Sequence, residues 1–196
     1  MNTQESKSFL EEFPRVFESL RKESDRGCVL VVGALLENAL EVQINARLLP
    51  KAVKEKDSDE LMSRSANSPI SSFSAKINLA YRLGIFPLHE RKIYHHLREL
   101  RNVCAHHIDT QNFDNNHFKD RIKNMINESE EFWNIISKAM MPRLFPDLQN
   151  ANVESFVNAV GWRVAFEFFF SMVIAHKKIS INRVARLTPL WESAQI

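Results

Sequence analysis

The fold class is decided by one stretch of sequence, CVLVVGALLENALEVQINARLL, which spans residues 28–49. Its apolar side chains recur every three or four residues and so share one face of a helix, which carries Val29, Val32, Leu36, Leu40, Ile44 and Leu48. The stretch is long enough to cross a membrane, but Glu37, Glu41 and Arg47 interrupt it. Because carboxylates inside a membrane are very costly, the stretch predicts a buried helix of a soluble protein, and we expect no membrane contact.

The same helical spacing continues on both sides of this stretch. It predicts further helices over residues 5–24, 72–84, 87–106, 114–140 and 152–177. Ser71 or Ser72 can cap the third predicted helix, Gly84 can end it, Pro87 suits the first turn of the next, and Pro142 is expected to end the helix over 114–140. No segment shows the alternation of a strand. The sequence therefore predicts an all-α bundle without a sheet, with the helices near 28–49, 72–84 and 87–106 at its core.

The composition is that of an ordinary soluble globular protein. Hydrophobic residues make up 44% of the 196 residues and charged residues 26%. Lys and Arg number 26 against 24 Asp and Glu, and the net charge of +2 is too small to indicate a nucleic-acid binder by itself. The two cysteines, Cys28 and Cys104, form no disulfide framework, which indicates a reducing compartment. Residues 1–10 show no secretory signal, so we expect a cytoplasmic protein.

The C-terminal part of the chain is predicted to be an addition to the main domain. We expect a helical domain over residues 1–141, followed over 142–196 by a C-terminal helix and a basic tail, which pack on the same bundle or on a partner subunit. The helix carries a run of apolar residues nearly all round, including Phe166, Phe168, Phe169 and Phe170. One helix cannot turn all four toward a single core, so part of the run is expected to contact another chain. This predicts a homodimer.

The densest group of candidate catalytic side chains lies at the end of the helix predicted over 87–106. On that helix Asn102 and His106 are four residues apart and share a face, with Arg98 one turn earlier. Arg101 points about 140° away from His106, because a helix turns about 100° per residue. Two copies packed about a twofold axis would bring two arginines and two histidines into one cleft.

These residue types are the ones that cleavage of an RNA phosphodiester needs. His106 can act as general acid or base, Arg101 can hold the scissile phosphate, and Asn102 can orient the pair. Arg98 and His107 would add contacts to the substrate. The 2′-hydroxyl is an internal nucleophile, so no metal is required. The alternative is that Arg101, Asn102 and His106 only cap a helix end and bind neighbouring carbonyls.

The pattern Arg101-Asn102-x-x-x-His106 at the end of a core helix resembles the RNxxxH motif of the HEPN superfamily. The resemblance implies a HEPN-like helical bundle, typically dimeric, with these three residues in the active site. It further implies a metal-independent endoribonuclease of a toxin–antitoxin or phage-defence system. RNA would be its substrate, and an antitoxin or regulatory protein a partner.

A second resemblance covers residues 27–126. GALLENALEVQINARLL, SPISSFSAKINLAYRLGIF and LRELRNVCAH, in this order, are similar to the mannitol operon repressor family of bacterial proteins. The name of that family implies a transcriptional regulator. The alternative to an enzyme is therefore a noncatalytic regulator that has kept the RNxxxH motif for its fold.

Two carboxylates on the 28–49 helix are candidates for a supporting role. Glu37 and Glu41 are four residues apart and lie on one face. One of them could steer His106 or pair with Arg101. The alternative is an ion pair that serves stability alone, because a buried carboxylate needs a partner in any case.

Metal sites are poorly supported by the sequence. His96 with Glu99, or Cys104 with His107, could supply two ligands each, whereas a closed site needs about four. Adjacent histidines on one helix point about 100° apart and cannot share an ion. We therefore expect no metal and no cofactor.

Overall fold

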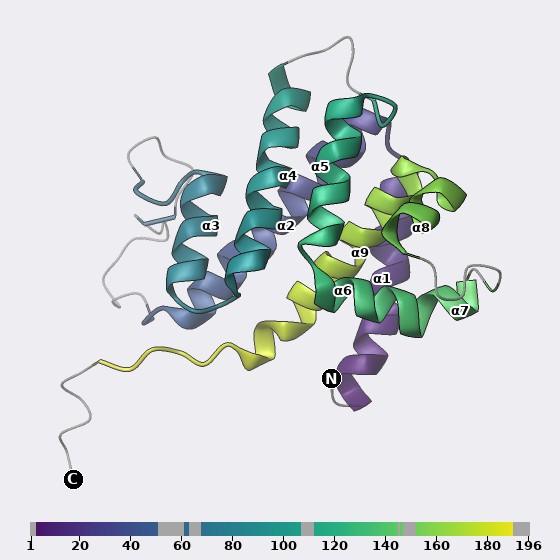
Figure 1. Cartoon of the computed structure of the whole chain (residues 1–196). Coiled ribbons are helices and arrows are strands. Elements are labelled where there is room, and N and C mark those ends of the chain that lie inside the picture. The colour runs from purple at the N-terminus through teal and green to yellow at the C-terminus, as the bar shows by residue number, and fades with distance from the viewer. Residues whose placement is uncertain are drawn as a thin grey trace.

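A computed structural model describes residues 3–50, 61–62, 68–106, 112–144, 146 and 152–189. Within these residues every regular element is helical and no strand occurs, which confirms the all-α prediction (Figure 1). The helices are α1 (Thr3–Arg21), α2 (Asp25–Arg47), α3 (Phe73–Arg82), α4 (Leu88–His106), α5 (Asn116–Asn127), α6 (Glu130–Ile135), α7 (Met141–Leu144), α8 (Val153–Val160) and α9 (Trp162–Ser180). A π-helical turn, η1 (Ile136–Met140), joins α6 to α7, and a 3-10 turn, η3 (Ile181–Arg183), follows α9.

Local capping explains where the core helices begin and end. The Ser72 hydroxyl accepts a hydrogen bond from the Ala75 amide at 3.1 Å, so α3 begins at the residue after Ser72. Gly84 follows α3 with φ 69°, the left-handed conformation expected of a glycine at this place. The caps predicted for this helix are therefore confirmed.

The single helix predicted over 114–140 is wrong. The chain breaks after α5 at Ser129, whose buried hydroxyl donates to the carbonyl oxygens of Met125 and Ile126, both at 2.9 Å. These bonds satisfy carbonyls at the end of α5 and allow a new helix to start. Pro142 does not end a helix either. It lies inside α7, which continues directly from the π-helical turn η1 as far as Leu144.

The single helix predicted over 152–177 is also wrong. Gly161 has φ 83°, and the chain bends there by 116° between α8 and the continuation of α9. The apolar period runs through this position unbroken, so the bend leaves no trace in the pattern. Only glycine takes up a positive φ without strain, and Gly161 is the residue that divides the two helices.

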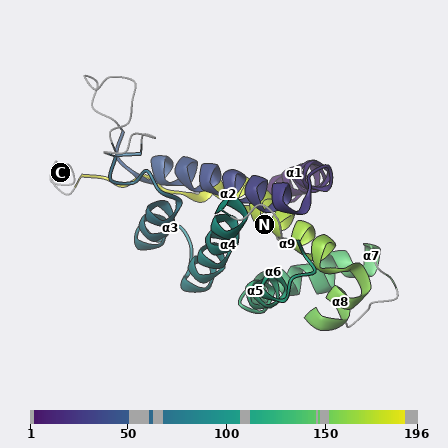
Figure 2. The ribbon, with the colours of Figure 1, turned by 90° about the horizontal axis from the view of Figure 1, so that it is seen from above.

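Helix α9 lies in the middle of the bundle. It packs against α1 and α2 on one side and against α5, α6 and α8 on the other (Figure 2). Residues from before and after position 141 thus share one hydrophobic core.

The phenylalanine run of α9 is buried on both sides. Phe168 meets Phe13 of α1 with ring centroids 5.1 Å apart, and Phe169 meets Phe132 of α6 at 6.0 Å. Phe166 and Phe170 are fully buried as well. The inference from this run to a second chain is therefore wrong, because a central helix can bury all of its faces inside one subunit.

Helix α2 is long and apolar enough to cross a membrane by length and composition alone, and the bent pair α8–α9 passes the same test if it is counted as one span. In this structure α2 is a core helix, because it packs against α1, α3, α4 and α9. Its apolar stripe is buried, and both of its central carboxylates, Glu37 and Glu41, pair with Lys76 of α3.

Candidate functional site

The candidate residues sit on the last turns of α4, and the buried face of that helix fixes where each one points. Ile93, Leu97, Leu100 and Cys104 are buried, so α4 is held along its length. Asn102 and His106 fall on the opposite side and are exposed. Arg101 falls between the two and is about one-third exposed.

Arg101 turns toward α2 and is held there by two contacts. Its Nη1 donates to Glu37 Oε2 at 3.0 Å, and its guanidinium lies over the Phe73 ring, 5.6 Å from the centroid. The side chain can approach α2 closely because residue 33 is glycine. A Cβ at Gly33 would lie 2.7 Å from Arg101 Cδ, too close for any side chain. The guanidinium is thus held in one place by contacts within the chain.

Glu37 links this arginine to a buried lysine. Lys76 has a side chain only 5% exposed, and its Nζ lies 3.2 Å from Glu37 Oε1 and 2.8 Å from Glu41 Oε2. Of the roles considered for the two carboxylates, the structure has Glu37 pairing with Arg101, while Glu41 pairs with Lys76. Lys76 and Gly33 were not among the residues predicted from the sequence. Their only signals are a lysine beside the apolar stripe of α3 and a glycine inside an apolar helix.

A cavity of about 360 Å³ opens where α4 meets the start of α3. Arg98, Arg101 and Asn102 line it from α4, Glu37 lines it from α2, and residues 71–74 line it from the start of α3. Two guanidiniums, three serines and a helix N-terminus meet in one hollow and favour an anion, while the Glu37 carboxylate in the same lining is matched by Arg101 and Lys76. The Nε of Arg98 is buried and makes no hydrogen bond among the described residues.

His106 stands apart from this cavity. It lies one turn beyond Asn102, about 6 Å further along the helix axis, and does not line the hollow. Within the part of the chain that the structure describes, the side chains of Asn102 and His106 form no hydrogen bond or ion pair. His107 lies outside the described residues. The structure thus brings together Arg98, Arg101 and Asn102, and leaves His106 beside them on the surface.

The end of α4 is capped by a residue outside the motif. Arg26 of α2 donates from Nε to the carbonyl oxygen of Cys104 at 2.6 Å. Arg101 binds a carboxylate, not a carbonyl. Arg101, Asn102 and His106 were the alternative caps for this helix end. At the carbonyl of Cys104, Arg26 makes that contact instead.

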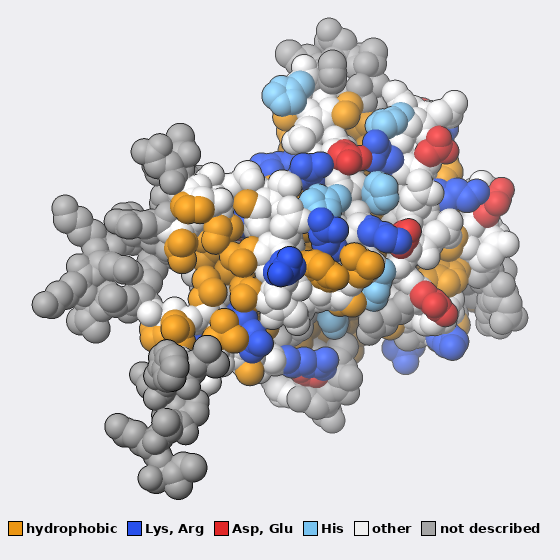
Figure 3. All heavy atoms as spheres, turned by 60° about the vertical axis from the view of Figure 1, so that its left-hand side comes forward, with side chains coloured by type: hydrophobic (Ala, Val, Ile, Leu, Met, Phe, Trp, Pro, Cys, Tyr) orange, Lys and Arg blue, Asp and Glu red, His pale blue; other side chains and the backbone are white. Residues whose placement is uncertain are grey.

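Further up α4, histidines and arginines form a polar band. Asn78 Oδ1 accepts from Arg91 Nε at 3.0 Å and lies 3.2 Å from His95 Nε2. Burial, helped by the charges of Arg98 and Arg91, lowers the pKa of His95, which favours its neutral form. His96 Nδ1 lies 3.3 Å from Arg121 Nη1. Figure 3 shows Lys, Arg and His side chains gathered across this side of the molecule.

In the part of the chain that the structure describes, the cysteines are unreactive and the acidic groups form no metal-binding cluster. Burial raises the pKa of Cys28 to about 12 and that of Cys104 to about 11, so both thiols stay protonated near neutral pH and are poor nucleophiles. Among the described residues, no three His, Cys, Asp or Glu side chains come together as metal ligands. No protein-family model, curated protein or solved structure matches the chain. The functional argument therefore rests on the geometry around Arg101.

Proposed function

We propose that the end of α4 is one half of a HEPN-type active site that cleaves RNA without a metal ion, and that a second copy of the chain supplies the other half. The observation that carries this proposal is the anion-favouring cavity lined by Arg98, Arg101 and Asn102, with the exposed His106 one turn away. Within one copy, the phosphate-binding groups and the proton carrier lie side by side but not in the same hollow. Two copies meeting at this surface would place each His106 against the other copy's arginines.

The chemistry follows from the residue types. His106 accepts the proton of the 2′-hydroxyl while the 2′-oxygen attacks phosphorus. The bond between phosphorus and the 5′-oxygen breaks, and that oxygen takes up a proton from water, so each site uses one His106. Arg101, held by Glu37, neutralises the charge that builds on the phosphate. The products carry a 2′,3′-cyclic phosphate and a 5′-hydroxyl.

The proposal includes a biological setting taken from the resemblance. In it the protein is a cytoplasmic toxin or phage-defence effector, and an antitoxin or regulatory protein restrains it. The basic side chains of α4, which are Arg91, Lys92, Arg98 and Arg101, support RNA as the substrate, because phosphate contacts of this kind are electrostatic. Cleavage should therefore weaken as the salt concentration rises.

The test is incubation of the purified protein with total RNA in EDTA. We expect cleavage by the wild type and a loss of about 10²–10⁴-fold in the His106→Ala variant, the contribution typical of a general acid or base. His89→Ala, on the first turn of the same helix, is the matched control and should cleave normally. Intact RNA after long incubation at high protein concentration would contradict the proposal.

One observation favours the second candidate, a noncatalytic regulator of the mannitol operon repressor type. The contacts of Arg101 with Glu37, Phe73 and the Gly33 backbone all lie within the chain and would stabilise the fold without any substrate. On this account Arg101→Ala lowers the melting temperature, His106→Ala changes nothing, and RNA stays intact with every variant.

A further inference from the structure

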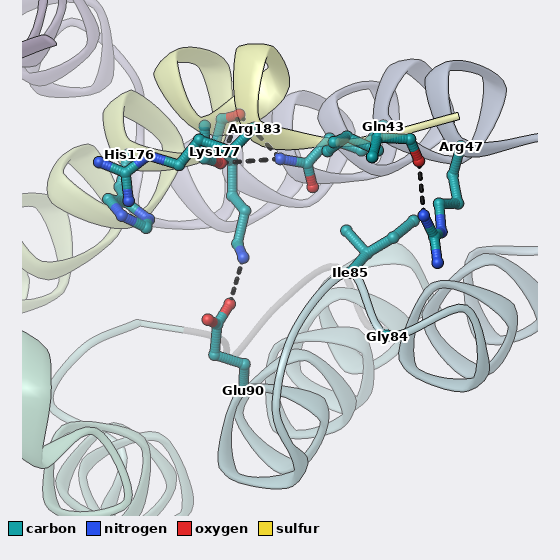
Figure 4. Close-up of a pocket in the computed structure, with 11 residues that line it drawn as sticks. Gln43, Arg47, Gly84, Ile85, Glu90, His176, Lys177 and Arg183 are labelled. Atoms are coloured by element: carbon teal, nitrogen blue, oxygen red, sulfur yellow. Dashed lines mark hydrogen bonds and ion pairs between the residues drawn. The ribbon is translucent and has the colours of Figure 1, made fainter. Parts of the chain in front are cut away.

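A second cavity, of about 320 Å³, lies at the other end of α4 (Figure 4). Glu90, on the first turn of α4, is 16 residues before His106, which places the two about 24 Å apart along the helix. The cavity is bounded by the last turns of α2 and α9, by the turn between α3 and α4, and by the segment after η3. It takes no part in the site proposed for RNA.

One wall of this cavity is a buried ion pair that is already satisfied. Lys177 Nζ lies 2.5 Å from Glu90 Oε2, and both side chains are less than one-tenth exposed. The Tyr94 hydroxyl donates to the same carboxylate, and burial beside Glu90 raises the pKa of Tyr94. Lys177 also lies over the Phe86 ring, 5.3 Å from its centroid. These groups hold one another and have little capacity left for a ligand.

Gln43 of α2 leaves an acceptor unused. The residue is 2% exposed, and its Nε2 donates to Lys177 O at 3.0 Å and to Ser180 Oγ at 2.9 Å. Its Oε1 is buried and makes no hydrogen bond among the described residues. In Figure 4 the amide nitrogen faces α9, and the oxygen points into the space between the helices. A buried acceptor without a donor is unfavourable, so a bound O–H or N–H group would be favoured here.

The rim of the cavity is cationic. Arg47 donates from Nη1 to Ala185 O at 2.6 Å, and its remaining N–H groups make no hydrogen bond within the described residues. Arg183 also lines the cavity, and its charge is balanced by Glu5, with Nε and Oε1 2.7 Å apart. Because Glu90 is matched by Lys177, Arg47 is the lining charge that no carboxylate balances among the described residues. An anion is therefore favoured over a cation.

We infer that this cavity binds a small organic anion that carries a hydroxyl group, with the anionic group at Arg47 and the hydroxyl donating to Gln43 Oε1. A hydroxyl is favoured over an ammonium group as the donor, because Arg47 already supplies a positive charge at the cavity. The volume lies at the lower end of the ~300–1,000 Å³ that small-molecule sites occupy. The segment after η3 closes one side, because the Leu187 amide donates to Arg47 O at 2.8 Å and keeps this segment on α2.

The test uses two pairs of probes that differ in hydroxyl groups alone. L-malate is compared with succinate, and glycerol 3-phosphate with propyl phosphate, by calorimetry and by the melting temperature at about 10 mM probe. We expect the hydroxylated member of one pair to bind about tenfold tighter than its partner, as one added hydrogen bond allows. The pair that responds identifies the anion as a carboxylate or a phosphate.

Variants assign the two contacts. Gln43→Met removes the acceptor and should make the two members of the responding pair bind equally, while Arg47→Gln should abolish binding of both. Arg15→Gln, an exposed arginine of α1, is the control and should bind as the wild type does. Absence of binding by all four probes, equal binding within both pairs by the wild type, or unchanged binding by Arg47→Gln would each overturn the inference.

Discussion

At the first turn of α4, Glu90 is buried and both Lys177 and Tyr94 bind its carboxylate. At the last turns of the same helix, Asn102 and His106 are exposed and bind nothing within the described residues. A buried charge needs partners for the fold to be stable, whereas an exposed polar group does not. The ion pair and hydrogen bond of Glu90 at the first turn of α4 are therefore explained by the stability of the fold. At the other end Asn102 and His106 have no partner among the described residues, so their substitution should leave stability unchanged and can test the proposed function alone.

Arg101 combines features of both ends of α4. It is held by Glu37 as firmly as a structural residue, yet it lines a cavity on the exposed side of the helix. Substitutions along α4 and its neighbours can separate the two kinds of residue, because each kind predicts a different loss of stability.

The largest loss of stability is expected when the buried pair is broken. Lys177→Met leaves the Glu90 carboxylate buried without a cation and should lower the free energy of unfolding by about 3–5 kcal/mol. The control is Lys92→Met, which removes an exposed partner of Glu128 and should cost only about 0–1 kcal/mol. Urea denaturation measures both, and equal losses would refute the distinction between buried and exposed pairs.

A smaller loss is expected where α2 and α4 come closest. In Gly33→Ala the new Cβ would collide with Arg101 Cδ, so the free energy of unfolding should fall by about 1–3 kcal/mol despite the better helix propensity of alanine. Gly27→Ala, on the first turn of α2, brings its Cβ within 2.7 Å of Glu23 Oε2, the end of an exposed side chain that can turn into solvent, and should stay within about 0.5 kcal/mol of the wild type. If the contact is the cause, adding Arg101→Ala to Gly33→Ala removes most of the penalty.

The pH dependence of stability tests the polar band on α4. The pKa of His95 is lowered in the folded protein, so the unfolded chain binds more protons as the pH falls through the ordinary histidine range near 6.5. The stabilisation is present above that range and is lost as the pH drops through it. His95→Gln should flatten this part of the stability curve, and a curve unchanged by the substitution would contradict the assignment.

The smallest effect on stability is expected at the exposed end of α4. Asn102→Ala and His106→Ala should each change the free energy of unfolding by less than about 0.5 kcal/mol, because neither side chain has a partner among the described residues. Thermal denaturation is sufficient to measure this. A loss above about 1 kcal/mol for His106→Ala would mean that the residue is structural.

Much of the helical framework could be predicted from the sequence, because it follows from a period that every core helix repeats. The two breaks that were missed, at Ser129 and Gly161, depend on single residues that interrupt no apolar stripe. A serine hydroxyl that donates to carbonyls of the preceding turn, and a glycine with positive φ, each act at one position. The spacing of apolar residues over a whole helix does not reveal them.

The candidate site was predictable only along one helix. Spacing placed Arg101 away from His106, and the structure agrees, with Arg101 turned toward α2. The residues that hold the arginine could not be found in this way, because Gly33 and Lys76 lie far from it in the sequence. Their contacts exist only once α2, α3 and α4 have packed.

The central claim, that two copies share one active site, is tested most directly by mixing inactive variants. Arg101→Ala and His106→Ala are co-expressed with different tags, and the mixed dimer is purified and incubated with RNA in EDTA. Each variant alone should be inactive. The mixed dimer should recover about half of the wild-type activity, because a twofold axis leaves one of its two sites with both residues intact. A mixed dimer as inactive as its parents, under conditions where the wild type cleaves, would contradict a shared site, and a wild type that leaves RNA intact would contradict the nuclease itself.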